Sequence, residues 1–122
     1  MRVLVAFEDT LYLYRTVISR ALRDLRPELN VRSTALSELE QELSSFDPHV
    51  VVCSQPNGVH PGRGAWVEIP TEDVIEDDEQ RLADICLDGE HWKSDGPPLK
   101  EILEVLDETE ERLREGNLSE VC

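Results

Sequence analysis

Two short apolar runs, separated by a longer amphipathic segment, constrain the fold of this chain more than any other feature. Residues 2–7 and 49–54 are nearly continuous stretches of apolar side chains, each too short for a core helix. Such runs are typical of strands buried on both faces of a parallel sheet. Between them, apolar residues recur every three or four positions from Leu11 to Arg26, which predicts an amphipathic helix that ends at Pro27. The predicted buried face of this helix comprises Leu11, Tyr14, Val17, Ile18, Ala21, Leu22 and Leu25.

A second strand and a second helix fit between these elements. Residues 30–36 predict a strand, and Ser37 and Glu40 have the spacing of a capping box. A short helix then follows with Leu39 and Phe46 on its apolar face. The order strand, helix, strand, helix, strand is that of two right-handed crossovers. We therefore expect a three-layer α/β/α fold around a mainly parallel central sheet.

The second half of the chain departs from this pattern. Residues 55–64 contain three glycines and two prolines, so we expect no crossover helix there. Because a parallel pair needs about a dozen residues of crossover, we expect the strand at residues 65–69 to run antiparallel to a neighbour. A further strand is predicted at residues 82–87, followed by a polar turn and a terminal helix to about Glu115. The second half is thus predicted to be irregular or partly antiparallel, within a single domain spanning residues 1–122.

Charge is distributed unevenly along the chain. The sequence has 12 Lys and Arg against 27 Asp and Glu, a net charge of -15. Residues 1–32 hold six Arg and four acids, a net of +2, so residues 33–122 carry -17. We therefore expect no nucleic-acid partner, which would require a basic face, and no apolar run is long enough to span a membrane. The acidic stretch at about residues 71–81 is interpreted as a flexible solvated loop, with a cation site or a docking surface for a basic partner as alternatives.

Residues 1–54 resemble the receiver domain of response regulators, the phosphoacceptor module of two-component signalling. The resemblance rests on residues 2–9, the helix after them and the apolar run that ends in Ser54. It implies a receiver-like or flavodoxin-like fold, in which two acids after the first strand hold Mg²⁺ and an aspartate ending the third strand accepts a phosphoryl group. Glu8 and Asp9 fall at or one place beyond the acidic pair, whereas Ser54 stands where the phosphoacceptor is expected. Because an acyl phosphate needs a carboxylate, the resemblance implies a degenerate receiver that has lost phosphotransfer.

Five side chains are candidates for a ligand site. Glu8, Asp9 and Ser54 follow strands whose carboxyl ends meet at one edge of the predicted sheet, where open α/β sheets bind ligands. His60 and Arg63 lie in the glycine-rich loop on the same edge, where backbone amides and a guanidinium suit an anion. The alternative interpretation is structural: Asp9 or Thr10 caps the following helix, Glu8 and Ser54 satisfy loop backbone groups, and the loop is a plain connection.

No spacing in the sequence indicates metal or covalent chemistry. Cys53, His60, Cys86 and His91 are suitable ligand types for zinc, but their spacing matches no compact zinc motif. A nucleophilic Ser54 lacks the Gly-x-Ser-x-Gly turn that would present its oxygen. We therefore expect no catalytic residue, no metal and no cofactor, and we expect Cys53 and Cys86 to be small buried residues.

The sequence favours a non-catalytic regulatory or protein-interaction module. Acidic residues follow the first apolar run too soon for a signal peptide, which predicts a cytoplasmic protein. The expected partner is another protein, and the pairing of receiver relatives through their last helices implies a homodimer. The alternative is a small-ligand or nucleotide-binding domain that uses the crevice at the carboxyl ends of the first and third strands. An atypical phosphoacceptor receiver is the third hypothesis.

Overall fold

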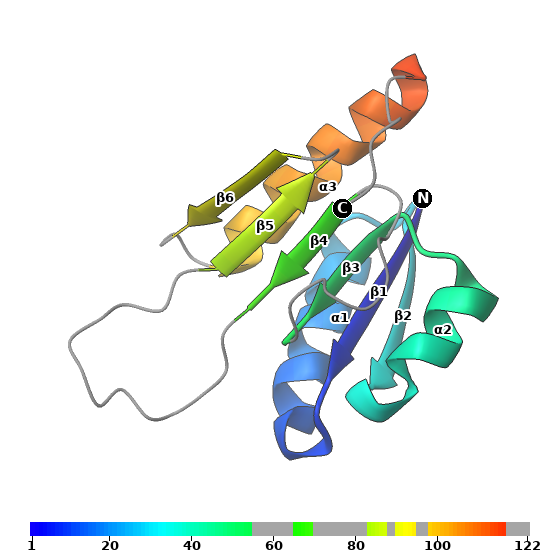
Figure 1. Ribbon diagram of the computed structural model, residues 1–122, viewed down its shortest axis with the longest axis vertical. Coiled ribbons are helices and arrows are strands. Elements are labelled where there is room, and N and C mark those ends of the chain that lie inside the picture. The colour runs from blue at the N-terminus through cyan, green and yellow to red at the C-terminus, as the bar shows by residue number, and fades with distance from the viewer. Residues whose placement is uncertain (55–64, 70–82, 88–89, 95–97, 117–122) are drawn as a thin grey trace.

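The computed structural model describes residues 1–54, 65–69, 83–87, 90–94 and 98–116. Within these residues, six strands form one mixed sheet in the order β2-β1-β3-β4-β5-β6 (Figure 1). The strands are β1 (Arg2–Phe7), β2 (Asn30–Ala35), β3 (Val50–Cys53), β4 (Ala65–Glu68), β5 (Ala83–Leu87) and β6 (Glu90–Ser94). The helices are α1 (Tyr12–Leu25), α2 (Leu39–Phe46) and α3 (Pro98–Glu115), and short 3-10 helices η1 (Asp9–Leu11) and η2 (Leu36–Glu38) precede the first two.

The first half of the chain has the predicted alternation of strands and helices. β1 pairs in parallel with β2 on one side and with β3 on the other, so crossovers through α1 and α2 build this part of the sheet. Every residue of β3 is buried, and so is every residue of β1 after Arg2. This burial is expected of strands covered on both faces. The mixed α/β class and the partly antiparallel second half are confirmed.

β4 pairs in parallel with one of its neighbours, although its short connection was expected to exclude parallel pairing. β4 runs antiparallel to β5 but parallel to β3. Eleven residues, 54–64, join β3 to β4. Fully extended, a segment of that length spans up to roughly 36 Å, whereas a four-residue strand is only about 13 Å long. The chain can therefore return to the opposite edge of the sheet, and pair in parallel, without a crossover helix.

The strand β6 was not predicted, because a polar turn was expected after β5. β5 and β6 pair as an antiparallel hairpin in which Leu87 faces Glu90 and Ile85 faces Trp92. Only two residues, Asp88 and Gly89, separate the strands in the sequence. An Asp-Gly pair between strand-forming runs is a strong hairpin signal, and it was available in the sequence.

Helices cover both faces of the sheet. α1 and α3 lie on one face, where Ile18 and Leu22 from α1 and Ile102 from α3 join the larger apolar core (Figure 1). α2 lies on the other face, where Leu39 and Phe46 pack into a smaller core. The smaller core also contains the predicted buried cysteines, Cys53 and Cys86.

The exposed side of α1 corrects the sequence interpretation of this helix. Ile18 and Leu22 are buried as predicted, but Val17 is 64% exposed and Leu25 is 48% exposed. Successive residues of an α-helix are rotated by about 100°, so the sheet that receives Ile18 leaves its neighbour Val17 pointing away. The buried stripe of α1 is therefore narrower than its apolar sequence pattern indicates.

The last described element is the C-terminal helix. α3 buries Ile102, Val105 and Leu106 against β3, β4 and β5. Its remaining surface is strongly charged, and none of the described helices is long and apolar enough to cross a membrane.

Candidate functional site

Glu8 and Ser54 meet at the carboxyl edge of the parallel strands. Glu8 follows β1 and Ser54 follows β3, and the register that pairs Ala6 with Cys53 places both at the same edge of the sheet. The Ser54 hydroxyl donates a hydrogen bond of 2.9 Å to Oε1 of Glu8. The sheet therefore brings together two of the side chains selected from the sequence.

The second carboxylate oxygen of Glu8 is left without a partner. Oε2 is buried and receives no hydrogen bond from the described part of the chain. A buried acceptor without a donor carries a desolvation cost of about 1–3 kcal/mol, and more when it is charged. A cation or a polar ligand that donates to this oxygen would remove that cost.

Asp9 lies beside the same edge but does not cap the helix. It belongs to η1, whereas α1 has Leu11 at its N-cap and no side-chain hydrogen bond there. The Asp9 side chain is 86% exposed, and its Oδ1 is 3.9 Å from Nη1 of Arg15. The capping alternative for Asp9 is therefore wrong.

An open hollow of about 300 Å³ connects these residues to the end of β2. Glu8 and Asp9 line one side, and Ala35, Leu36 and Ser37 line the other. Ser37 lies in η2 and does not form the predicted capping box, because α2 begins after Glu38 without a side-chain cap. This hollow lies at the ends of β1 and β2, whereas the ligand crevice is predicted at the carboxyl ends of the first and third strands.

Arg15 is a structural residue at this edge that the sequence interpretation missed. Its Nη1 donates hydrogen bonds to the backbone oxygens of Thr34, at 3.0 Å, and Phe7, at 3.3 Å. Only 13% of its side chain is exposed. Arg15 precedes Ile18 and Leu22 by three and seven residues, so its place on the sheet-facing side of the helix was visible in the sequence.

A row of three charged side chains crosses the antiparallel half of the sheet. Glu68 faces Asp84 on the next strand, and Asp84 faces Lys93 on the strand after it. Burial raises the pKa of Glu68, and the Asp84 charge raises it further, against the opposing effect of Lys93. This row was not predicted, because Glu68 and Asp84 are single polar positions in their strands, Lys93 is one of several in β6, and only the register brings the three together.

The other two candidate residues lie outside the described residues. His60 and Arg63 belong to residues 55–64, and the acidic stretch at about residues 71–81 is likewise outside them. Among the residues that the structure does describe, no three His, Cys, Asp or Glu side chains gather closely enough to hold a metal ion.

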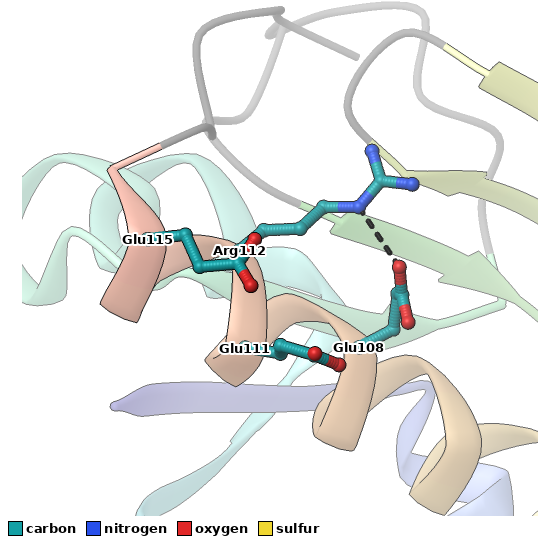
Figure 2. A pocket seen from close by; sticks show the side chains of 4 residues that line it. All are labelled: Glu108, Glu111, Arg112 and Glu115. Atoms are coloured by element: carbon teal, nitrogen blue, oxygen red, sulfur yellow. Dashed lines mark hydrogen bonds and ion pairs between the residues drawn. The ribbon is translucent and has the colours of Figure 1, made fainter.

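The charged surface of α3 forms a second, larger hollow. Glu108, Glu111, Arg112 and Glu115 line an open space of about 490 Å³ (Figure 2). Nε of Arg112 donates a 3.1 Å hydrogen bond to Oε1 of Glu108, one helical turn away. Three carboxylates against one guanidinium leave this surface acidic, so it does not suit an anionic ligand.

Large apolar side chains are exposed on α1. Leu13 is 76% exposed, Val17 is 64% exposed and Tyr12 is 57% exposed; these three residues are named the α1 patch. Leu13 and Val17 are one helical turn apart, and Arg20 lies on the next turn of the same side. Arg20 is exposed, and it forms no hydrogen bond or ion pair with another described residue. The sequence interpretation missed the patch because it placed Val17 on the buried face.

No protein-family model, curated protein or solved structure matches this chain. What the chain does must therefore follow from its own residues.

Proposed function

We propose that this chain is a non-catalytic protein-interaction module that docks on a partner protein through the α1 patch. One observation carries the proposal: Tyr12, Leu13 and Val17 present large apolar side chains to solvent within two turns of one helix. Covering these side chains removes apolar surface from water, at roughly 25 cal/mol per Å². Contiguous apolar surface on a protein frequently marks an interaction site.

The same proposal makes the module a degenerate receiver relative with a regulatory role in the cytoplasm. The parallel order β2-β1-β3-β4 supports this relationship, because it is the order of flavodoxin-like sheets. Ser54 at the end of β3 supports the loss of phosphotransfer, because a hydroxyl cannot form an acyl phosphate. We accordingly expect no Mg²⁺-dependent labelling of the chain by acetyl phosphate; labelling that Glu8→Ala abolishes would instead favour an atypical phosphoacceptor.

Affinity capture from an extract of the source cells tests the docking surface. The full chain is compared with the double variant Leu13→Ser/Val17→Ser and with Trp92→Ser, a control that removes an exposed apolar side chain from β6. Docking through the α1 patch predicts a partner that the wild type and the β6 control retain and the double variant loses. An identical set of captured proteins for all three would refute the proposal.

A second candidate function is favoured by the unpartnered oxygen of Glu8. We propose as the alternative that the hollow beside Glu8 and Asp9 binds a cation or a small polar ligand. Titration calorimetry with Mg²⁺, Ca²⁺ and common nucleotides tests it, with Glu8→Gln as the variant that keeps the shape and removes the charge. Binding that this substitution abolishes would support the alternative, and no heat with any ligand would refute it for those ligands.

A further inference from the structure

We propose that the occupant of the α1 patch is a second copy of this chain, in a weak two-fold dimer of antiparallel α1 helices. This inference rests on the proposed function, because it takes α1 as the docking surface. It names the partner and the register of the contact. Leu13 of each copy packs against Val17 of the other, and Arg20 of each copy pairs with Asp9 of the other.

Net charge favours α1 over the rest of the surface for self-association. Each copy carries -15, so two copies repel one another. Residues 1–32, which contain α1, carry +2, whereas residues 33–122 carry -17. The outer surface of α3 is acidic, with Glu108, Glu111 and Glu115 around one arginine. Contact through α1 therefore brings together the parts of two copies that repel least.

The spacing of charges along η1 and α1 is self-complementary. In an antiparallel pair centred midway between Leu13 and Val17, Arg20 lies five residues beyond the centre, or about 7.5 Å at 1.5 Å per residue. Asp9 lies six residues before the centre, three steps in the α-helix at about 1.5 Å and three in the 3-10 helix η1 at about 2.0 Å, or roughly 10 Å in all. The two-fold axis reverses the direction of the second helix, so Arg20 of one copy falls beside Asp9 of the other. The arrangement repeats at both ends of the apolar contact, as a two-fold interface requires.

Both charged groups are available for such a pair. Arg20 is exposed and has no partner among the residues that the structure describes. The Asp9 carboxylate is 86% exposed and lies 3.9 Å from Arg15, whose guanidinium is held by the backbone oxygens of Phe7 and Thr34. Asp9 can therefore accept Arg20 of a second copy without leaving a buried guanidinium unpaired.

The size of the patch sets the strength of the dimer. A contact built on three apolar side chains per copy is smaller than the roughly 1,200–2,000 Å² of a stable interface. We therefore expect a dissociation constant weaker than about 1 µM, with the monomer dominant in dilute solution.

Sedimentation equilibrium of the full chain, from low micromolar to near-millimolar concentration, tests the inference. We expect wild type to dimerise with rising concentration and Leu13→Asp/Val17→Asp to remain monomeric. Arg20→Glu is expected to weaken the dimer by roughly 2- to 30-fold, the factor for two exposed ion pairs of ordinary strength. The double variant Asp9→Lys/Arg20→Glu restores the pairs with their signs exchanged and is expected to recover most of that loss.

Two controls separate this contact from general charge effects and from the other exposed edge. Arg114→Glu on α3 changes the net charge as much as Arg20→Glu does, at a side chain that is 74% exposed. This control is expected to leave the dissociation constant of the dimer near the wild-type value. Trp92→Asp on β6 tests pairing through the edge strand and is expected to leave the dimer unchanged. Circular dichroism checks that every variant is folded.

Several results would overturn the inference. A wild-type chain that stays monomeric throughout, a dimer that survives Leu13→Asp/Val17→Asp, or a dimer lost only with Trp92→Asp would each do so. Failure of the charge exchange to restore affinity would reject the antiparallel register. If wild type is monomeric while α1 variants still lose a captured protein of another kind, the proposed function stands and this inference fails. If α1 variants alter neither measurement, both fail.

Discussion

Truncating two leucines on opposite sides of α1 tests the orientation of the helix on which the docking surface depends. Leu22 is fully buried in the larger core, whereas Leu13 is 76% exposed. Leu→Ala is the same chemical change at both positions, and it alters intrinsic helix propensity little. The two substitutions therefore differ mainly in what surrounds the side chain.

The expected destabilisation follows from burial. Leu22→Ala removes a fully buried side chain and leaves a cavity, which costs about 3 kcal/mol within a range of roughly 2–5. For a chain of this length, 1 kcal/mol shifts the melting temperature by about 4 °C, so we expect a fall of about 12 °C. Leu13→Ala removes an exposed side chain, and its effect is expected to stay within about 0.5 kcal/mol, or about 2 °C.

Thermal and urea unfolding followed by circular dichroism measure both effects. The two melting temperatures should differ by about 10 °C, with the denaturant slope unchanged if both variants retain the same folded and unfolded states. Equal losses at the two positions would refute the assigned orientation of α1. The α1 patch would then be part of the core, and the proposed docking surface would fall with it.

Three further predictions concern groups whose environment the sequence does not reveal. The buried hydroxyl of Ser19 has no hydrogen-bond partner among the described residues, so Ser19→Ala is expected to raise the free energy of unfolding by up to about 1 kcal/mol in urea titrations. A clear loss of stability would contradict this. Burial, and then the charge of Arg2, lowers the pKa of His49 below 6.5, and neutral Nδ1 accepts the Arg2 backbone N–H at 3.0 Å. The stability that neutral His49 contributes is therefore complete above pH 6.5, and it falls as the pH drops toward the lower pKa of the folded state. Melting curves from neutral pH to pH 5 should show this loss of stability in wild type. They should not show it in His49→Asn, whose amide oxygen can accept the Arg2 N–H without titrating. The pKa of Glu68 is raised from 4.5, so ionised Glu68 disfavours folding above that raised pKa, and this penalty is relieved as the pH falls through it. Glu68→Gln should therefore melt at a higher temperature than wild type at pH 7 and lose this advantage in acid. A lower melting temperature for Glu68→Gln at pH 7 would contradict the prediction.

Five of the six strands are predicted from the sequence, and the clearest local patterns are those of strands whose consecutive residues are buried. β1 and β3 are covered on both faces, so nearly every position is apolar and a local pattern is sufficient. β6 differs because the side chains of Glu90, His91, Trp92 and Lys93 are all exposed, and its existence depends on pairing with β5. Only the two residues between those strands carried a local indication of the hairpin.

The polar contacts of the candidate site also divide into those that the sequence predicts and those that depend on the register of the strands. The contact between Glu8 and Ser54 follows from the rule that parallel strands end at one edge, so it could be expected without knowing any distance. The row of Glu68, Asp84 and Lys93 depends on the register of three strands, and no local pattern sets that register. The exposed side of α1 was only partly predictable. The sequence indicates an amphipathic helix, but its apolar residues extend around more of the helix than one sheet can cover.

Three arginines fix which side of α1 faces outward. Arg15 donates to backbone oxygens at the ends of β1 and β2, Arg23 donates to a β2 oxygen at 3.0 Å, and Arg26 forms two hydrogen bonds of 3.1 and 3.0 Å to a carboxylate of α3. Placing Val17 where Ile18 packs requires a rotation of about 100°, which would break all of these bonds. It would also leave partly buried carbonyl oxygens without donors, at about 1–3 kcal/mol each, which offsets much of the gain from covering one valine. The outward orientation of the α1 patch is therefore held by polar contacts on the opposite side of the helix, and the apolar side chains remain available to a second molecule.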